Sequence, residues 1–267
     1  IEDNSSEIKS LAENQDGSIY LAVGRGNPHP YNKQLAVLTK LSADGDVLWE
    51  KLFDDTYRGF FDDIVIEKNT LMVFGSKETS GVTPEEEAEF GYRAENIDYW
   101  LLKLDLDGSI IWERTYDDGG YAFPRRIILN KGGGYTIAGY TWVQYDYSIG
   151  RILRLDKNGE IIFNIGSDLS SINDIYESND GGIVATGKVD WSPKGEVMGF
   201  YKFDAYGNEV WRQQYHENLT VIFGKGVIQC PDDGFLVIGA SSKYYYSVGE
   251  GPQLLVYKTD PFGFFQN

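Results

Sequence analysis

The feature that most constrains this chain is a hairpin that recurs five times along it. Each copy is an alternating strand, a glycine where the chain must turn back, and a second strand that in four copies ends in an aromatic residue. Self-similarity at a regular spacing indicates a repeat architecture. The copies are Val37–Trp49, Leu101–Trp112, Ile152–Phe163, Phe200–Trp211 and Val256–Asn267, with turn glycines Gly45, Gly108, Gly159, Gly207 and Gly263.

A second repeated unit precedes each hairpin, and it consists of a turn followed by a strongly apolar strand. A short strand comes before it, so each repeat contains four strands, here named A to D in chain order. Four-stranded repeats of this length predict an all-β fold, a five-bladed β-propeller of four-stranded antiparallel blades, rather than a linear array of sheets. The predicted single domain spans 1–267, with blades at about 6–53, 60–118, 124–167, 171–217 and 224–267.

The best-preserved repeat resembles a known family. Residues 98–116, Asp-Tyr-Trp-Leu-Leu-Lys-Leu-Asp-Leu-Asp-Gly-Ser-Ile-Ile-Trp-Glu-Arg-Thr-Tyr, followed by Gly-Gly-Tyr-Thr-Ile-Ala-Gly-Tyr-Thr at 133–141, are similar to secreted or cell-surface propeller repeats of bacteria and archaea. That family repeats W-L-x-K-L-D-x-x-G-x-I-x-W and D-G-G-Y-x-x-A-G-x-T. The resemblance implies a propeller outside the cytoplasm and no agreed catalytic residues. Phe163 replaces the tryptophan in the third repeat, and Asn267 stands where the fifth would be.

Composition excludes several classes of function. With 41 acidic and 24 basic residues the net charge is −17, which is unfavourable for binding nucleic acid or an anionic membrane. We expect no membrane-spanning segment, because no run of 18 apolar residues occurs. A single cysteine, Cys230, and two histidines leave little material for a disulfide, a zinc site or a Ser-His-Asp triad.

We therefore predict no metal and no cofactor. The segment Asp105–Gly108 has some features of a calcium loop, but the spread ligands and terminal Glu of such a loop are absent. A quinone-dependent dehydrogenase would need a larger ring and metal ligands. The polar start of the chain at Ile1 is typical of a protein whose signal or lipid-anchor segment has been removed, so we expect a secreted or cell-surface protein.

Long loops are predicted between the B and C strands of each blade, and they share one face because strand direction alternates. Binding residues often lie on long loops of a rigid scaffold. Aromatic side chains there suit sugar stacking or protein recognition, although each could equally pack over the end of a blade. The candidates for ligand binding are Tyr31, Tyr92, Trp142, Tyr145, Trp191 and Tyr245.

Charged residues stand at roughly matched positions at the starts of the predicted A strands, which should line the central channel. They are Asp62, Asp63, Arg125, Arg126 and Asp174. These charges could satisfy one another as ion pairs, or the two arginines could bind a ligand carboxylate, including that of an acidic sugar. In an enzyme, Asp62 or Asp63 together with Asp174 would supply the two carboxyl groups of glycoside hydrolysis.

Taken together, the sequence favours a non-enzymatic extracellular binding or scaffold propeller, with no catalytic residues, that contacts a glycan or protein ligand through its long B–C loops. The alternative is a carbohydrate-active enzyme, a glycoside hydrolase that uses the carboxylates of the channel.

Overall fold

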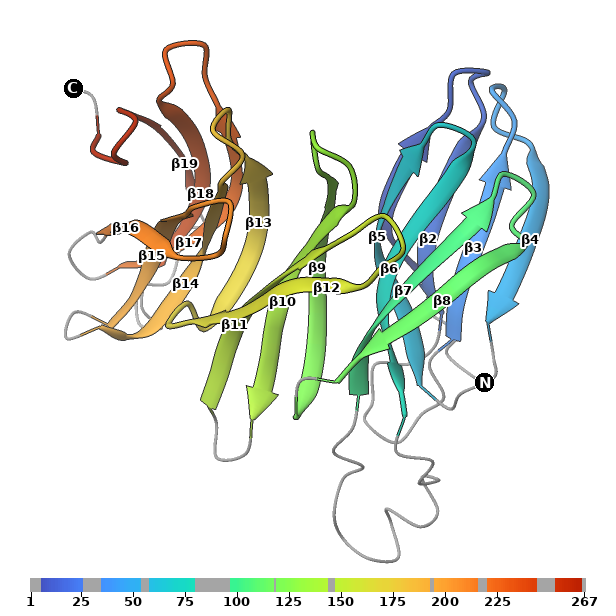
Figure 1. Ribbon diagram of the computed structural model, residues 1–267, viewed down its shortest axis with the longest axis horizontal. Helices are drawn as coiled ribbons and strands as arrows, with labels where there is room; N and C mark the ends of the chain where they lie inside the picture. Colours follow the sequence, from blue (N-terminus) through green and yellow to red (C-terminus); the bar gives the residue numbers. More distant parts are fainter. Residues whose placement is uncertain are drawn as a thin grey trace, which may run out of the picture. The chain divides into compact units, whose positions relative to one another are not determined.

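The structure, a computed structural model, describes residues 6–25, 35–53, 58–79, 97–117, 119–143, 147–192, 195–215, 220–243 and 253–265. Within these ranges every regular element is a β-strand, which confirms the all-β prediction (Figure 1). None of these residues belongs to a helix that could cross a membrane.

The first sheet is a four-stranded antiparallel meander in chain order. It consists of β1 (Ser6–Glu13), β2 (Ile19–Arg25), β3 (Leu35–Leu41) and β4 (Val47–Phe53). A second meander of this kind consists of β13 (Ser171–Glu177), β14 (Ile183–Ser192), β15 (Gly195–Phe203) and β16 (Glu209–Tyr215). Both meanders follow the predicted order of strands A to D.

The predicted second and third blades are joined in one eight-stranded sheet. Its first four strands are β5 (Gly59–Glu67), β6 (Thr70–Glu78), β7 (Ile97–Asp105) and β8 (Ile110–Tyr116). The others are β9 (Tyr121–Leu129), β10 (Tyr135–Val143), β11 (Tyr147–Leu155) and β12 (Ile161–Ser167). A parallel pairing between Ile97 and Tyr121 connects the two sets. The count of five separate blades therefore stays a prediction.

The last sheet contains β17 (Thr220–Gln229), β18 (Phe235–Lys243) and β19 (Gln253–Thr259). An antiparallel bridge between Thr259 and Phe265 starts the next hairpin. The rings of Tyr215, Tyr257 and Phe265 stack at this point, with centroids 3.9 Å apart for Tyr215 and Phe265. This hairpin matches the position of the predicted last C–D turn.

The strands form two compact units, each with its own apolar core. Unit 1 comprises residues 1–127 and 141–146, and unit 2 comprises residues 128–140 and 147–267. In unit 1, Phe61 and Trp100 stack with ring centroids 5.0 Å apart among buried aliphatic side chains. In unit 2, Phe200 meets Trp211 and Phe235 edge-on. Aromatic and β-branched side chains thus fill both cores, as expected for packed sheets.

An aspartate three residues before the glycine shapes each repeated C–D hairpin from the second to the fifth. In the fourth repeat, Asp204 Oδ1 accepts hydrogen bonds from the backbone N–H groups of Tyr206 and Asn208, both at 2.9 Å. Asp105, Asp156 and Asp260 make the same pair of contacts. Aspartate is favoured in such turns because its side chain bonds its own backbone. The motif that has features of a calcium loop is therefore a turn motif, and its Oδ1 atom is already used.

The hairpin glycine also makes room for an aromatic ring of the preceding repeat. A Cβ atom on Gly207 would lie 3.1 Å from Phe163 Cδ2, and one on Gly263 would lie 2.9 Å from Trp211 Cζ3. Gly108 approaches Trp49 in the same way, at 3.0 Å from Cη2. All of these glycines have positive φ. One residue therefore shapes the turn and also packs successive sheets together.

We predict that Gly207→Ala destabilises the protein more than Gly45→Ala does. Both glycines have positive φ, +88° and +91°, but nothing lies within 4 Å of a Cβ atom on Gly45. Gly45→Ala should lower the free energy of unfolding by about 1 kcal/mol from backbone strain alone. Gly207→Ala adds a clash with Phe163 and should cost about 2 to 3 kcal/mol. Denaturant unfolding measures both, and equal losses would contradict the packing role.

Candidate functional site

A β-bulge interrupts the first strand of the repeat at a matched position. In the pairs β1–β2, β5–β6, β13–β14 and β17–β18, the register skips Lys9, Asp62, Asn173 and Lys225 respectively. A bulged residue is left out of the ladder, and the bulge changes the direction of its side chain. Because the bulge recurs, it is a regular feature of the repeat. In each of these repeats it affects one residue of the first strand, which we call the inner strand.

Glycines of the second strand allow the inner strand to approach closely just before the bulge. A Cβ atom on Gly75 would lie 2.0 Å from the Phe60 carbonyl oxygen, and one on Gly187 would lie 1.8 Å from that of Ser171. No side chain fits at such distances. These glycines end the second repeated unit of the sequence, so that motif encodes the geometry around the bulge.

The aspartate that follows the bulge ties one inner strand to the next. Asp63 Oδ2 accepts a hydrogen bond from Ile127 N at 2.9 Å, and Asp174 Oδ2 accepts one from Val227 N at 2.8 Å. Asp63 Oδ1 also accepts one from Ser10 Oγ at 2.7 Å. Asp63 therefore links β5 to β1 and β9, while Asp174 links β13 to β17.

The structure brings four of the five predicted channel residues together in unit 1. Arg125 Nη1 lies 3.8 Å from Asp62 Oδ1, and Arg126 Nη1 lies 3.3 Å from Asp63 Oδ2. Ile127 and Val227 are equivalent, because the backbone N of each donates to the aspartate after a bulge. Arg125, two residues before Ile127, therefore corresponds to the bulged Lys225, two residues before Val227. Asp174 belongs to unit 2. The predicted ion-pair network is thus present in unit 1.

Asp62 is the chemically unusual member of this group. Its side chain is only 9% exposed, and its Oδ2 atom is buried without a hydrogen-bond partner among the described residues. Burial raises the pKa of Asp62 to about 6, although the positive charges of Arg125 and Lys9 oppose this rise. The negative charges of Asp63 and Glu7 add to it. Asp62 is therefore partly protonated near neutral pH, as a general acid must be.

Glu7 and Lys9 also influence Asp62, although the sequence analysis did not include them among the candidate residues. They lie on β1, where Lys9 Nζ and Glu7 Oε2 form an ion pair at 2.7 Å. Their side chains are 32% and 72% exposed. Lys9 could have been found from its matched position in the repeat, but no periodic signal marks Glu7.

Most of the predicted aromatic ligand residues lie outside the described part of the chain. These are Tyr31, Tyr92, Tyr145 and Tyr245, together with the side chain of Trp191, a residue of β14. Trp142 lies on β10 and is 36% exposed. Ligand binding by these residues stays a prediction.

An open pocket of about 490 Å³ lies at the C-terminal end of β6 and beside β8. Lys77, Thr79 and Glu113 are among its lining residues. Lys77 forms an ion pair with Glu113, which also accepts a hydrogen bond from Trp100 Nε1 at 2.8 Å. These groups satisfy one another, so the pocket walls are held by internal contacts.

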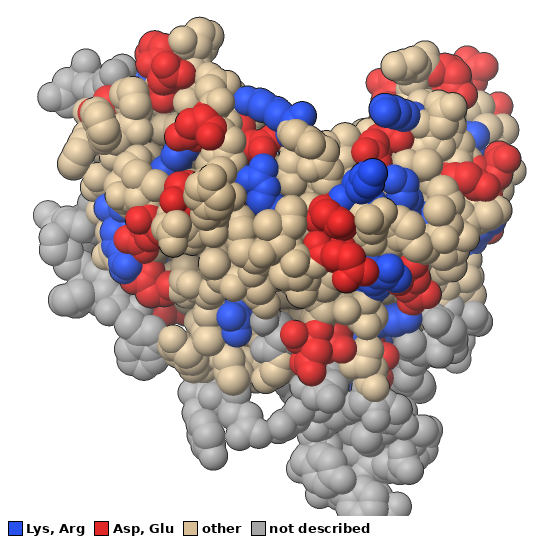
Figure 2. Space-filling model, in the orientation of Figure 1, with Lys and Arg blue, Asp and Glu red and all other residues tan. Residues whose placement is uncertain are grey.

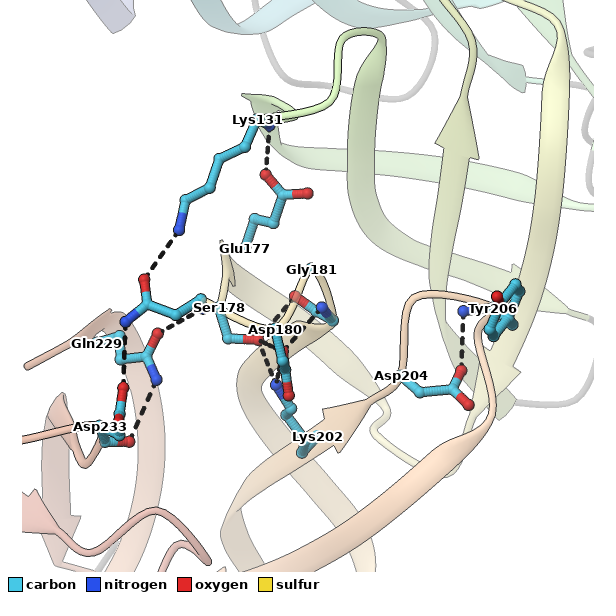
Figure 3. Close-up of polar contacts among 12 residues, drawn as sticks. Lys131, Glu177, Ser178, Asp180, Gly181, Lys202, Asp204, Tyr206, Gln229 and Asp233 are labelled. Atoms are coloured by element: carbon cyan, nitrogen blue, oxygen red, sulfur yellow. Dashed lines mark hydrogen bonds and ion pairs between the residues drawn. The ribbon is translucent and has the colours of Figure 1, made fainter.

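The turns between the A and B strands of unit 2 form a separate polar network (Figure 3). Lys131 donates from its backbone N to Glu177 Oε2 at 2.5 Å and from Nζ to Asn179 Oδ1 at 3.1 Å. Asn179 N donates to Gln229 Oε1 at 2.7 Å, and Asn179 Nδ2 donates to Asp233 Oδ1 at 3.2 Å. The network thus connects three successive turns.

The carboxylates of this network are strongly engaged. Arg154 Nη2 lies 2.6 Å from Glu177 Oε1, and both side chains are largely buried. Burial raises the pKa of Asp180, but hydrogen bonds from Lys202, Ser178 and the Gly182 backbone outweigh it and lower that pKa to about 2. A carboxyl group with this pKa stays ionised and is unsuited to donate protons near neutral pH. We therefore interpret this network as a structural one that links neighbouring sheets.

Charges on the described surface are mixed in sign. Figure 2 shows Lys and Arg side chains next to Asp and Glu side chains on the face that it draws. Within the described ranges, no group of three or more His, Cys, Asp or Glu side chains could hold a metal ion.

No family model matches the sequence, and no curated protein matches it. The structure is similar to that of puromycin hydrolase, with a TM-score of 0.51 and 12% identity over 94% of this chain and 45% of that one. It is also similar to a GH43 β-xylosidase/α-arabinofuranosidase from a compost microbial metagenome, with a TM-score of 0.49 and 8% identity over 97% and 92%. A GH43 enzyme from Xanthomonas citri, complexed with xylotriose, gives 0.48 and 8% over 97% and 88%.

At these identities the similarity is one of fold alone. The chain spans less than half the length of puromycin hydrolase. Even so, the prediction of a non-enzymatic binding or scaffold protein is contradicted by these comparisons, in which the reported structure with a TM-score above 0.5 is that of a hydrolase.

We predict that two neighbouring substitutions change stability in opposite directions. Asp63→Asn should lower the free energy of unfolding by about 2 kcal/mol, because an amide cannot accept all the hydrogen bonds that Asp63 receives. Asp62→Asn should raise it by about 1 kcal/mol at pH 7.5, because it removes a buried carboxylate whose Oδ2 has no hydrogen-bond partner among the residues that the structure describes.

The sign for Asp62 follows from its raised pKa. Its stabilising contribution is complete below its ordinary value of 3.8 and is lost as the pH rises through about 6. The advantage of Asp62→Asn should therefore shrink as the pH falls toward 4. Urea unfolding at several pH values measures this, and destabilisation by Asp62→Asn at pH 7.5 would contradict the assignment.

Proposed function

We propose that the chain is a glycoside hydrolase in which the Asp62 carboxyl group is the proton donor. In this proposal the sheets are the blades of a five-bladed propeller, and the protein is exported to act on a carbohydrate. The observation that carries the proposal is the buried Asp62 carboxyl, whose Oδ2 has no hydrogen-bond partner in the described part of the chain and whose pKa is raised to about 6.

A general acid for glycoside hydrolysis must hold its proton near neutral pH and give it to the leaving oxygen. Burial keeps the proton on Asp62, and the bulge removes its backbone from the ladder. Asp63, one residue further on, is bound by four hydrogen-bond donors. Of the two adjacent carboxyl groups, Asp62 is the one with an oxygen, Oδ2, that has no hydrogen-bond partner among the described residues.

The second carboxyl group of the reaction is best supplied by Glu7. The negative charges of Asp63 and Glu7 both raise the pKa of Asp62. Asp63 is occupied by neighbouring strands, whereas the Glu7 side chain is 72% exposed. We therefore propose Glu7 as the base or nucleophile and Asp62 as the acid.

The first test is the dependence of activity on Asp62. In a panel of aryl glycosides, kcat/KM should fall as the pH rises above about 6, because the acid must be protonated. Asp62→Asn should lower kcat/KM by about 100-fold or more for leaving groups of high pKa. The loss should be much smaller for a 2,4-dinitrophenyl leaving group, which needs no proton.

Asp44→Asn is the matched control, because Asp44 is an exposed turn residue of the same unit. Its activity should stay within about twofold of the parent. Unchanged kcat/KM in Asp62→Asn across all leaving groups would refute the acid role. A parent that hydrolyses no member of the panel, nor natural polysaccharides, would refute the function.

Glu7 is tested by chemical rescue. Glu7→Ala should fold normally, since the side chain is exposed, and should lose about 100-fold in activity. Sodium azide should restore part of that activity by taking the place of the carboxylate at the sugar. Full activity of Glu7→Ala would exclude Glu7 and leave Asp62 to be judged on its own results.

A further inference from the structure

A side-chain hydrogen bond joins the two strands that carry the proposed acid and the proposed base. Ser10 Oγ on β1 donates to Asp63 Oδ1 on β5 at 2.7 Å. Asp63 is only 3% exposed, so the acceptor is a buried carboxylate, and hydrogen bonds to such charged groups are strong. Each of the two residues directly follows a bulge. The bond therefore fixes the bulged residues Lys9 and Asp62 with respect to each other.

The strands β1 and β5 belong to different sheets, so the ladder hydrogen bonds that set register within a sheet do not align them. Apolar packing also links them, because Ala12 of β1 packs against the core that contains Phe61 and Ile64 of β5. Such packing is non-directional, whereas a hydrogen bond requires a particular distance and angle. The bond from Ser10 to Asp63 therefore supplies a direction that the packing does not.

Ser10 departs from the pattern of the repeat. After the bulge, Asp63 and Asp174 accept a hydrogen bond from the backbone of the next inner strand. By that pattern Ser10 would accept one from Ile64 N, but Ile64 N donates to Asp63 Oδ1 at 3.0 Å. A hydroxyl can donate to Asp63, whereas an aspartate at this position would place a second carboxylate against it. The junction between β1 and β5 thus requires a donor where other junctions use an acceptor.

The chain next to Ser10 carries groups that act on Asp62. Lys9 and Glu7 precede Ser10 on β1, and Lys9 Nζ lies 2.7 Å from Glu7 Oε2. Besides burial, which raises the pKa of Asp62, the charges of Lys9 and Glu7 act on it in opposite directions. A shift of β1 along β5 would move both charged groups relative to Asp62.

We propose that Ser10 is a positioning residue, which holds Glu7 and Lys9 of β1 in the place relative to Asp62 that glycoside hydrolysis requires. The inference rests on the function proposed above. Ser10 acts through Asp63 and through the strand that it fixes, and it takes no part in the proton transfer. Catalytic geometry tolerates little displacement, because a shift of about 1 Å can lower a rate by about 100-fold.

The test begins with Ser10→Ala, which removes the hydroxyl. Its kcat on aryl glycosides should fall by about 10-fold or more while KM changes by less than about twofold, because the substrate still binds but meets a misaligned pair of carboxyl groups. Ser10→Thr keeps a hydroxyl on a residue type suited to strands, so its kcat should lie within about threefold of that of the parent. Circular dichroism checks that each variant is folded at the assay temperature.

Ser18→Ala is the matched control. Ser18 Oγ donates to Asp16 Oδ1 at 2.6 Å in the turn between β1 and β2, so this variant loses the same kind of hydrogen bond from the same sheet. That bond joins residues of one turn and does not align β1 with β5. The kcat and KM of Ser18→Ala should therefore equal those of the parent, even though its stability falls.

A kcat of Ser10→Ala equal to that of the parent would overturn the inference, and so would a loss that Ser10→Thr does not recover. A rise in KM without a fall in kcat would also overturn it. In each of these cases a parent that hydrolyses glycosides leaves the proposed function standing. A parent without glycosidase activity would refute the proposed function, and the positioning role with it.

Discussion

The contact between a hairpin glycine and the aromatic ring of the preceding repeat is the constraint that organises each unit. Trp49 packs on Gly108, Phe163 on Gly207 and Trp211 on Gly263. Each contact needs a residue without a side chain, because a Cβ atom would come within about 3 Å of the ring. Since the same glycine also has positive φ, the turn and the packing between sheets depend on one residue. This double requirement explains why the motif recurs so regularly.

The inner strands show how a repeat that builds a fold can also provide chemistry. The carboxylate after the bulge binds the backbone of the next inner strand, as Asp63 and Asp174 do. The bulged residue varies from lysine to aspartate to asparagine, and Asn173 also donates a hydrogen bond from Nδ2 to the Gly224 carbonyl oxygen of the next inner strand. A buried carboxyl oxygen without a partner among the described residues, as in Asp62, lowers stability, and costs of this kind concentrate at functional sites. The bulge therefore accepts different residue types while the arrangement of the strands stays the same.

The fold alone would have been a poor guide to function, because one fold supports many activities. The structure distinguishes between adjacent residues that the sequence pattern does not distinguish. Arg126 and Asp63 form part of the scaffold, whereas Arg125 and Asp62 interact weakly with each other across 3.8 Å. The turn network around Glu177 and Asn179 contains many charged groups, but these groups form hydrogen bonds and ion pairs with neighbouring turns and strands.

The sequence by itself determined the strands, their order within each repeat and the hairpin chemistry. Those features depend on contacts within a few residues, such as the bonds from Asp204 to the backbone of Tyr206 and Asn208. It also placed Asp62, Asp63, Arg125 and Arg126 at matched positions, which the structure brings together. Only the tertiary structure decided which adjacent aspartate holds the next strand, and only it brought Glu7 into view. The reason is physical, because a bulge changes the direction of side chains and residues some 60 positions apart, such as Asp63 and Ile127, meet only once the strands have packed.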